Sequence, residues 1–543
     1  MLYKFGKWVL KVNQLYYNGE ILTMNSTNEI VEAILIKDQV IEAVGTYEEL
    51  RLKADKMTAV EEINLQGKTL MPGIIDAHLH FVMYGVTKIN IDCKNLKITN
   101  LNQLYEAIQK RVRETEEGYW VRVNGFNELS MDEKCYPLKE DLDAISTKHP
   151  IMITRTCGHI GVVNSLGLLM ANIDEQTPNP QGGEIEKDQT GKLTGRLLET
   201  AYMQLNEQAT YTIEELEEAM QLAQQDFFKV GITSIHEAGT FNVDSFRQLQ
   251  LASHERRVKL RIYAMIGSLN NCYDFTTTMM KSGVVTGTGD AHFKIGPAKL
   301  FVDGSSTGPT IATREPYTSN QNDYGMFIYT EDELYEVLGD AHAKGYQITV
   351  HAQGDAAIER YLNVIERALK ENPRPHRHRI EHAGITTPDL QEKMKALQII
   401  PIPNPPFPYE FGESYEKNYG ERIDYMYPVA DFLQHQLIVA AGSDAPITTV
   451  NPWVGIHTAV NRHTALGQPF GIRQSISLME ALKIYTYNGA YASFEEHQKG
   501  SLESGKLADY IILNQAITKT NRDELKNIEV VQTVIGGEVV YKV

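Results

Sequence analysis

Apolar and polar positions alternate between strand-like and helix-like spacing along the middle of the chain. Strand-like runs of apolar residues are separated by segments in which apolar residues recur every three or four positions. The helical segments have recognisable first turns: Thr212 with Glu215, Thr330 with Glu333, and Thr387-Pro388. Repeated strand–helix alternation predicts a parallel sheet covered by helices.

Eight apolar segments in this region end in polar residues and are predicted strands. They are IIDAHLH (74–80), ITSIHEAG (232–239), LRIYAMI (260–266), KIGPAKLFVDG (294–304), QITVHAQGD (347–355), RIEHAG (379–384), QIIPIPN (398–404) and LIVAAGSD (437–444). Eight parallel strands with polar groups at their carboxyl ends are typical of a (β/α)8 barrel, whose active site lies at that end. We therefore expect an α/β, TIM-like barrel over residues 71–499.

The two ends of the chain have a different pattern, with short alternating strands and turn signals. Asn18-Gly19 lies in the first region, and Gly536-Gly537 marks a hairpin in the last. We expect residues 1–70 and 500–543 to form one small β-sandwich domain from both termini. Two separate edge hairpins are the alternative.

About 150 residues separate the first predicted barrel strand from the second. They contain the strand-like segments WVRVNGF and PIMITRT. We interpret residues 86–210 as an insertion after the first barrel strand, placed to act as a lid or specificity wall. Counting PIMITRT as a barrel strand would give nine, which a (β/α)8 barrel cannot accommodate.

Composition narrows the classes of partner. The 543 residues include 52 basic and 70 acidic side chains, a formal charge of −18, which argues against nucleic acid as a partner. The N-terminal apolar run is only Trp8-Val9-Leu10, and no segment has the ~18 apolar residues of a membrane span. The four cysteines show no CxxC spacing. We expect a cytoplasmic protein with reduced thiols and no membrane partner.

The strongest local signal for chemistry is LMPGIIDAHLHF. Side chains alternate along a strand, so His78 and His80 share one face. Two imidazoles on one face at the end of a barrel strand can bind one cation through neutral nitrogens.

Lys299 lies inside the apolar run AKLFV, where a lysine is costly to bury unless it is paired or chemically altered. A desolvated lysine loses its proton readily, and the neutral amine can capture carbon dioxide as a carbamate that bridges two metals. The alternative is an ion pair with a buried carboxylate such as Asp303, which lies on the same strand face as Lys299 at period two.

Three further polar residues close predicted strands. His351 and His382 end consecutive strands, and Asp444 ends the eighth, which lies beside the first in a closed barrel. We expect all three to be metal ligands, with Asp444 also the general base; a helix N-cap is the other interpretation of Asp444. His376 and His378 lie among arginines and are expected on the solvated surface.

This set of residues resembles the amidohydrolase superfamily. The segments GHIGVVNS, GGEIEKDQTGKLTGRLLE, GITSIHEAG and KLFVDGS resemble its amidohydrolase family 3 branch, which is similar to N-substituted formamide deformylases. The resemblance implies one metal held by His78, His80, Lys299 and Asp444, and a second held by carbamylated Lys299, His351 and His382. Glu237 and Gln353 depart from the branch, where aspartate and an aliphatic residue are usual, so substrate preference is open.

The function expected from these residues is hydrolysis of a non-peptide carbon–nitrogen bond in a small molecule by a metal-activated hydroxide. One or two divalent cations are expected, zinc first, although the same ligands accept iron, manganese or cobalt. His159 and Asp303 are further catalytic candidates, and His236, Glu237 and Asn461, followed by Arg462, are candidates for substrate binding.

Two other functions compete with this one. A single-metal deaminase or cyclic-amide hydrolase on the same barrel would not need the Lys299 carbamate, and a non-catalytic scaffold would have lost metal ligands. Metal content separates all three. A homodimer is the expected assembly from general frequencies alone.

Overall fold

The structure of the chain is a computed structural model. It describes residues 13–93, 96–156, 160–180, 183–199, 201–202, 204–205, 209–269 and 271–543. The apolar run at residues 8–10, Cys157 and the catalytic candidate His159 lie outside the described residues. The chain divides into two compact units, Met1–Phe81 with Gln224–Val543, and Val82–Ala223.

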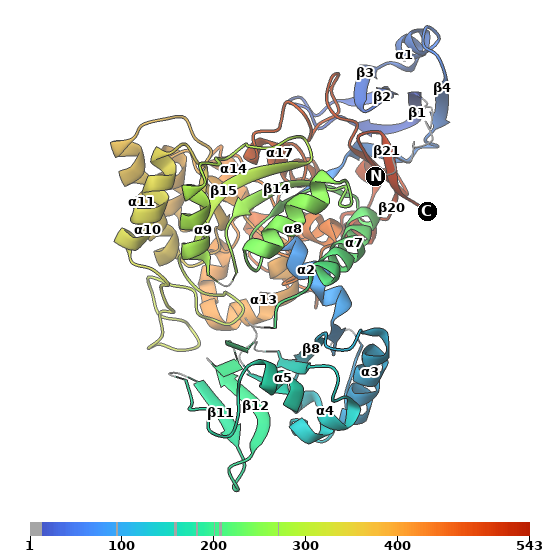
Figure 1. The fold of residues 1–543 in the computed structure, drawn as a ribbon. Coiled ribbons are helices and arrows are strands. Elements are labelled where there is room, and N and C mark those ends of the chain that lie inside the picture. Colours follow the sequence, from blue (N-terminus) through green and yellow to red (C-terminus); the bar gives the residue numbers. More distant parts are fainter. Residues whose placement is uncertain are drawn as a thin grey trace. The chain divides into compact units, whose positions relative to one another are not determined.

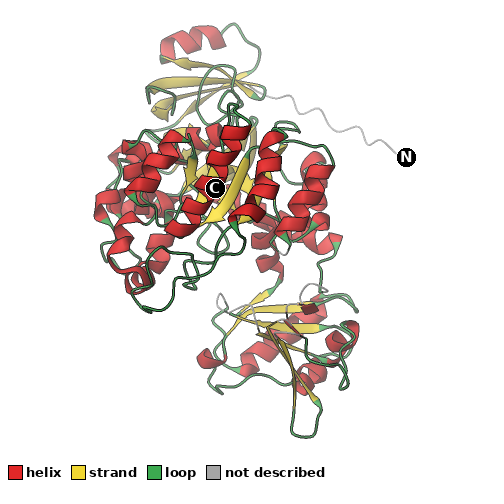
Figure 2. Ribbon diagram, turned by 90° about the vertical axis from the view of Figure 1, so that its left-hand side faces the viewer, coloured by secondary structure: helices red, strands yellow, loops and turns green. Residues whose placement is uncertain are grey.

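A parallel seven-stranded sheet forms the centre of the first unit (Figure 1). Its strands, in order across the sheet, are β18 (Ile400–Ile402), β17 (Arg379–His382), β16 (Ile348–Ala352), β15 (Phe293–Phe301), β14 (Arg261–Ile266), β13 (Ile232–Glu237) and β6 (Ile74–Leu79). Each neighbouring pair is parallel. Helices surround these strands, as Figure 2 shows, so the fold is a nearly closed α/β, TIM-like barrel.

The helices between strands begin where the capping signals predict. Thr212 and Glu215 bond reciprocally at the start of α7, and Thr330 and Glu333 do so at the start of α10. The helices of this unit and of its junctions are α1 (Tyr47–Ala54), α2 (Phe81–Ile89), α7 (Ile213–Lys229), α8 (Val243–His254), α9 (Cys272–Lys281), α10 (Glu331–Ala343), α11 (Asp355–Glu371), α12 (Pro388–Ala396), α13 (Pro406–Tyr419), α14 (Val429–Gln434), α15 (Pro452–Asn461), α16 (Leu478–Ile484) and α17 (Tyr487–Ala492).

The eighth predicted strand, 437–444, is not a regular strand, which corrects the expectation of eight. Its backbone nevertheless lies between the first and last strands: Ala440 and Gly442 donate to the carbonyls of Pro401 and Pro403, and Asp444 donates to the carbonyl of His78. Pro401 and Pro403 have no N–H to return to this segment, so half of the ladder on that side is missing. The segment closes the barrel without forming a strand.

Strands from both termini join in one sheet of eight strands. Its hydrogen-bonded path is β21 (Glu538–Lys542), β20 (Val530–Ile535), β19 (Tyr510–Leu513), β5 (Thr69–Pro72), β1 (Asn13–Leu22), β2 (Ile30–Lys37) and β3 (Val40–Gly45), with β4 (Val60–Asn64) beside β1. Because β19 pairs with β5, two separate edge hairpins are excluded. The hydroxyls of Tyr16 and Tyr510, 2.8 Å apart, join the two ends in a buried contact.

The second unit, Val82–Ala223, has its own sheet and two cores. The strands are, in order, β11 (Gly183–Lys187), β12 (Leu193–Glu199), β10 (Ile160–Val163), β9 (Ile151–Arg155), β8 (Val121–Phe126) and β7 (Ile91–Asp92). Helices α3 (Leu101–Glu114) and α4 (Lys139–Ile145) pack on the face that carries Ile151 and Ile153, and α5 (Ser165–Met170) packs on the Met152 face. PIMITRT is therefore β9 of this sheet and not a barrel strand.

The cysteines and the search for a membrane-spanning helix bear on two further expectations. Cys93, Cys135 and Cys272 are free thiols, two of them buried. Within the described ranges, no helix is both long enough and apolar enough to cross a membrane.

Candidate metal centre

The six predicted ligands come from one end of the barrel. His78 lies in β6 and His80 directly follows that strand, Lys299 lies in β15, His351 lies in β16, His382 ends β17, and Asp444 ends the closing segment. Five of them are buried and His351 is half-buried. Strand register brings them together because parallel strands place their carboxyl ends at the same rim.

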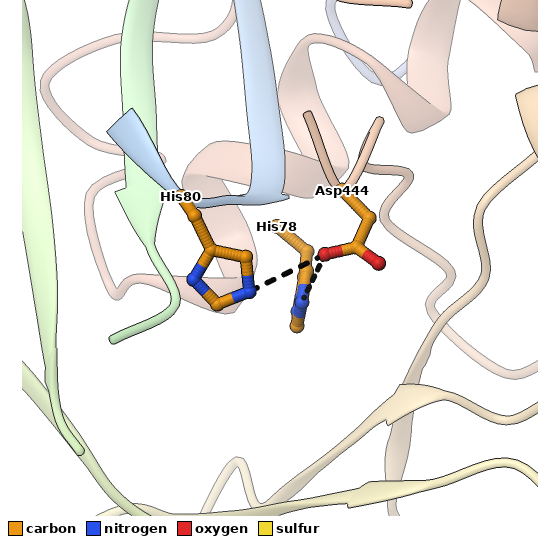
Figure 3. Close-up of side chains that lie close together, drawn as sticks. All are labelled: His78, His80 and Asp444. Atoms are coloured by element: carbon orange, nitrogen blue, oxygen red, sulfur yellow. Dashed lines mark ion pairs between the residues drawn. The ribbon is translucent and has the colours of Figure 1, made fainter. Parts of the chain in front are cut away.

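Asp444 contacts two of the predicted ligands, His78 and His80. Its Oδ1 lies 3.3 Å from His78 Nε2 and 3.4 Å from His80 Nε2 (Figure 3). The ring centroid of His382 lies 4.6 Å from that of His78 and 4.5 Å from that of His351. Among the described residues, His78, His80 and Asp444 form a group whose ligand atoms lie within 4.8 Å of one another.

Each of the four histidines is fixed by an acceptor on one ring nitrogen. The Nδ1 atoms of His78, His80 and His382 face Glu381 Oε2, Gly239 O and Asn404 Oδ1, at 2.5, 3.1 and 2.7 Å. The Nε2 of His351 faces Gly304 O at 2.7 Å. An acceptor on one nitrogen holds the proton there and leaves the other nitrogen as a ligand atom, which is the usual arrangement of metal-binding histidines.

The electrostatics of the histidines suit cation binding. Burial lowers the pKa of His351 to about 4 and that of His382 well below its ordinary value, so both imidazoles are neutral. Burial also acts to lower the pKa of His78, but the neighbouring carboxylates of Asp444 and Glu381 outweigh it and raise that pKa. The buried Nε2 of His78 has no hydrogen-bond partner among the described groups. A site that draws a proton onto His78 also attracts a cation.

Asp444 is ionised despite its burial. Burial acts to raise its pKa, but the close contacts with the imidazoles of His78 and His80 hold the pKa well below its ordinary value. Imidazole nitrogens and a carboxylate oxygen are the donors that zinc accepts in hydrolase sites, so this donor set fits a divalent cation.

Lys299 is completely buried and donates from Nζ to the carbonyl of Ala238 at 2.7 Å. Burial lowers the pKa of its ammonium group, which favours the neutral amine, although Glu381 opposes the effect. Lys299 lies close enough to His78, His80, His351 and His382 for its ammonium charge to act to lower the pKa of each imidazole. Asp303, the alternative ion-pair partner, instead accepts hydrogen bonds from backbone N–H groups.

The remaining candidates have structural contacts. Asp303 accepts from the backbone N–H groups of Ala312, Gln353 and Gly354, and therefore anchors the loops after β15 and β16. Its Oδ1 lies 3.6 Å from His351 Nε2. Glu237 accepts from the backbone N–H of Phe81 at 2.8 Å, directly after His80.

His236, Asn461 and Arg462 are buried, and their hydrogen-bond partners are residues other than the six predicted ligands. His236 Nδ1 accepts from Arg379 at 2.8 Å. The amide of Asn461 bonds to His457 and Arg522, and Arg462 donates to the carbonyls of Met426 and Phe470. None of these described contacts joins the three residues directly to a predicted metal ligand.

Two carboxylates outside the predicted set support the site, Asp76 and Glu381. Asp76 accepts from the backbone N–H groups of His78 and Ser443, and so ties the first strand to the residue before Asp444. Asp76 could have been found, because it shares the strand face of His78 and His80 at period two. Glu381 could not, because strand alternation places it opposite His382.

Comparison with known proteins gives the family. The amidohydrolase family model matches residues 61–541, which is most of the chain. The chain belongs to the amidohydrolase family. It is therefore an amidohydrolase, an enzyme that hydrolyses carbon–nitrogen bonds other than peptide bonds.

Relatives of this amidohydrolase match over nearly their full length. YtcJ of Bacillus subtilis is 28% identical over 534 residues, 97% of this chain and 99% of YtcJ. The N-substituted formamide deformylase of Arthrobacter pascens is 27% identical over 535 residues, 97% of each chain. A Pyrococcus furiosus protein, solved as an uncharacterized metal-dependent hydrolase, is 25% identical with a TM-score of 0.78, covering 94% of this chain and all of that one.

Proposed function

We propose that this amidohydrolase is a metal-dependent hydrolase that cleaves a non-peptide amide bond of a small molecule. The observation that carries the proposal is the convergence of four histidines, each fixed on one ring nitrogen, around the ionised Asp444. The name of the Arthrobacter relative supports an amide or formamide substrate, and the name of the Pyrococcus protein supports the metal.

His78, His80, Lys299 and Asp444 would hold one cation, and Lys299, as a carbamate, would share a second with His351 and His382. Zinc suits this donor set best. When bound, such cations lower the pKa of a water molecule from ~15.7 to ~7 and polarise a substrate carbonyl.

Asp444 is the group that moves the proton. It is ionised, so it can accept the proton of the attacking water, and as the acid it can return that proton to the leaving nitrogen. Its contacts with His78 and His80 keep Oδ1 fixed, while the second carboxylate oxygen remains to receive the proton. Asp303 anchors the loop that follows His351, and Glu237 holds the backbone directly after His80.

The test combines metal analysis with a substrate screen. Purified protein is assayed for metal content and then, replete with Zn²⁺, against N-formyl amines, N-acyl amines, acylated amino acids, cyclic ureides and esters. We expect one or two cations per chain and turnover within the amide group. Metal-replete protein that hydrolyses none of these amides would overturn the proposal.

The Lys299 carbamate has its own measurement. Protein reconstituted with Zn²⁺ in ¹³C-labelled bicarbonate should show a carbamate ¹³C resonance that Lys299→Met lacks. One cation per chain with an unmodified lysine would instead favour the single-metal deaminase or cyclic-amide hydrolase.

A further inference from the structure

One of the four acceptors that face the histidine rings carries a charge, and the other three are neutral. His80, His351 and His382 rest on neutral oxygens, those of Gly239, Gly304 and Asn404, whereas His78 rests on the carboxylate of Glu381. The His78–Glu381 contact, 2.5 Å between Nδ1 and Oε2, is also the shortest of the four. A charged acceptor strengthens a hydrogen bond and makes the imidazole a stronger donor to a cation.

Glu381 is itself fixed from every side. Its Oε1 accepts from Thr349 at 2.7 Å and from Arg379 Nε at 2.9 Å, and its Oε2 accepts from a second Arg379 nitrogen at 2.9 Å. Arg379 is held in turn by His236 and the carbonyl of Ala77. Thr349 and Arg379, the two residues that bond to Glu381 besides His78, are completely buried, so the carboxylate has one available orientation.

From this geometry we infer that Glu381 is a positioning residue: it holds the proton of His78 on Nδ1, aims Nε2 at the cation, and strengthens metal binding at the His78–His80–Asp444 group. The inference rests on the proposed function, because it concerns the same metal centre. Loss of such an outer partner typically weakens metal binding by about 10–100-fold.

A Glu381→Gln variant should bind the metal more weakly, although glutamine has the same shape as glutamate. Both oxygens of Glu381 accept from the Arg379 guanidinium, so either orientation of a glutamine sets its NH2 group against a donor. If that NH2 group faces His78, the Nδ1 atom must accept, and the ring proton moves to Nε2, the atom that binds metal.

The test measures Co²⁺ binding to the chelator-treated full-length chain by visible absorbance. Glu381→Gln should bind its first Co²⁺ about 10–100-fold more weakly than the wild type. Thr349→Val is the matched control, because it removes a hydrogen bond to the same carboxylate without contacting His78, and it should bind Co²⁺ like the wild type. An equal loss in both variants, or no loss in Glu381→Gln, would overturn the inference.

Glu381→Gln leaves the buried Arg379 unpaired and can prevent folding. The double variant Arg379→Met/Glu381→Gln removes both charges and leaves an amide oxygen able to accept from His78. It should fold and still bind Co²⁺ more weakly than the wild type. Wild-type affinity in this variant would show that the charge of Glu381 is not needed.

A spectroscopic readout separates positioning from a purely structural role. In the Zn²⁺-loaded wild type, the His78 Nδ1–H proton should give a downfield ¹H resonance, shifted upfield in the double variant. A wild type that binds no metal would overturn the proposed function itself. A wild type that binds metal, with variants that bind equally, would overturn only the role of Glu381.

Discussion

Two of the candidate ligands have a left-handed backbone. His382 has φ of 70° and Asp444 has φ of 60°, a region that non-glycine residues seldom adopt. Such residues cost about 1–3 kcal/mol each and persist where the surrounding structure holds them. Asn404 holds the His382 ring, and the carbonyl of His78 accepts from the Asp444 backbone N–H. The strain therefore lies at two residues of the proposed metal site.

Asp444→Asn tests the proton-transfer role. The variant should retain much of its metal, because His78, His80 and Lys299 remain, but its kcat should fall about 10²–10⁴-fold because an amide cannot take the proton. The measurement is kcat together with metal content on the best substrate of the screen. The exposed Asp332→Asn serves as control and should leave both unchanged. Retained turnover in Asp444→Asn would remove this residue from the base role.

His378 shows how sequence context misleads at the residue scale. The neighbouring arginines favoured a solvated position, but the residue is completely buried. Its Nε2 lies 2.8 Å from His342 Nδ1, and its Nδ1 accepts from the backbone N–H of Ile348. Burial lowers its pKa well below the ordinary value, so it is a neutral hydrogen-bonding group and the surface expectation was wrong.

At the scale of elements, strands and helices were predictable wherever local chemistry decides them. Six of the seven barrel strands start within one residue of their predicted segments, and β18 starts two residues later than predicted. The capping boxes at Thr212 and Thr330 are confirmed. The irregular backbone of the closing segment could not be predicted from its own residues. It depends on Pro401 and Pro403 in the neighbouring segment, which have no N–H groups to donate to it.

The N-caps of α10 and α12 offer a comparison within one molecule. Thr330 accepts from the backbone N–H of Glu333 at the start of α10, whereas Thr387 makes no side-chain cap at the start of α12. Thr330→Ala should therefore lower the free energy of unfolding by about 1 kcal/mol, and Thr387→Ala by less. Urea denaturation measures both. Equal losses would show that the capping bond does not explain the effect.

At the scale of the whole molecule, a buried ion pair joins the terminal sheet to the barrel. Asp509, directly before β19, accepts from two nitrogens of Arg261, the first residue of β14, at 2.5 and 2.8 Å. Both side chains are almost completely buried. Nearby, Lys259 and Glu538 join the same two parts through an exposed contact.

Asp509→Asn should lower the free energy of unfolding by about 3–5 kcal/mol, because it leaves the buried Arg261 charge uncompensated. Glu538→Gln, at the exposed pair, should cost at most about 1 kcal/mol. Urea denaturation at neutral pH checks both. Similar losses in the two variants would contradict the distinction between the buried and the exposed pair.

The pH dependence of the stabilisation by the Arg261–Asp509 pair follows from the pKa of Asp509. Burial acts to raise that pKa, but the charge of Arg261 outweighs it, so the folded value lies below the ordinary 3.8. The stabilisation is therefore present above pH 3.8 and is lost as the pH falls through the folded pKa. The difference between wild type and Asp509→Asn should shrink in that acidic range and stay constant above it.

The sequence by itself determined the class of fold, the helix starts and the six side chains that meet at the barrel rim. These follow from local spacing, because a strand's alternation and a parallel sheet's direction decide which residues share a face and an end. Only the tertiary structure decided how the imidazoles are fixed. Glu381, Gly239, Gly304 and Asn404 come from other strands or loops, and an acceptor's position relative to a ring nitrogen is a matter of three-dimensional packing that no spacing along the chain encodes.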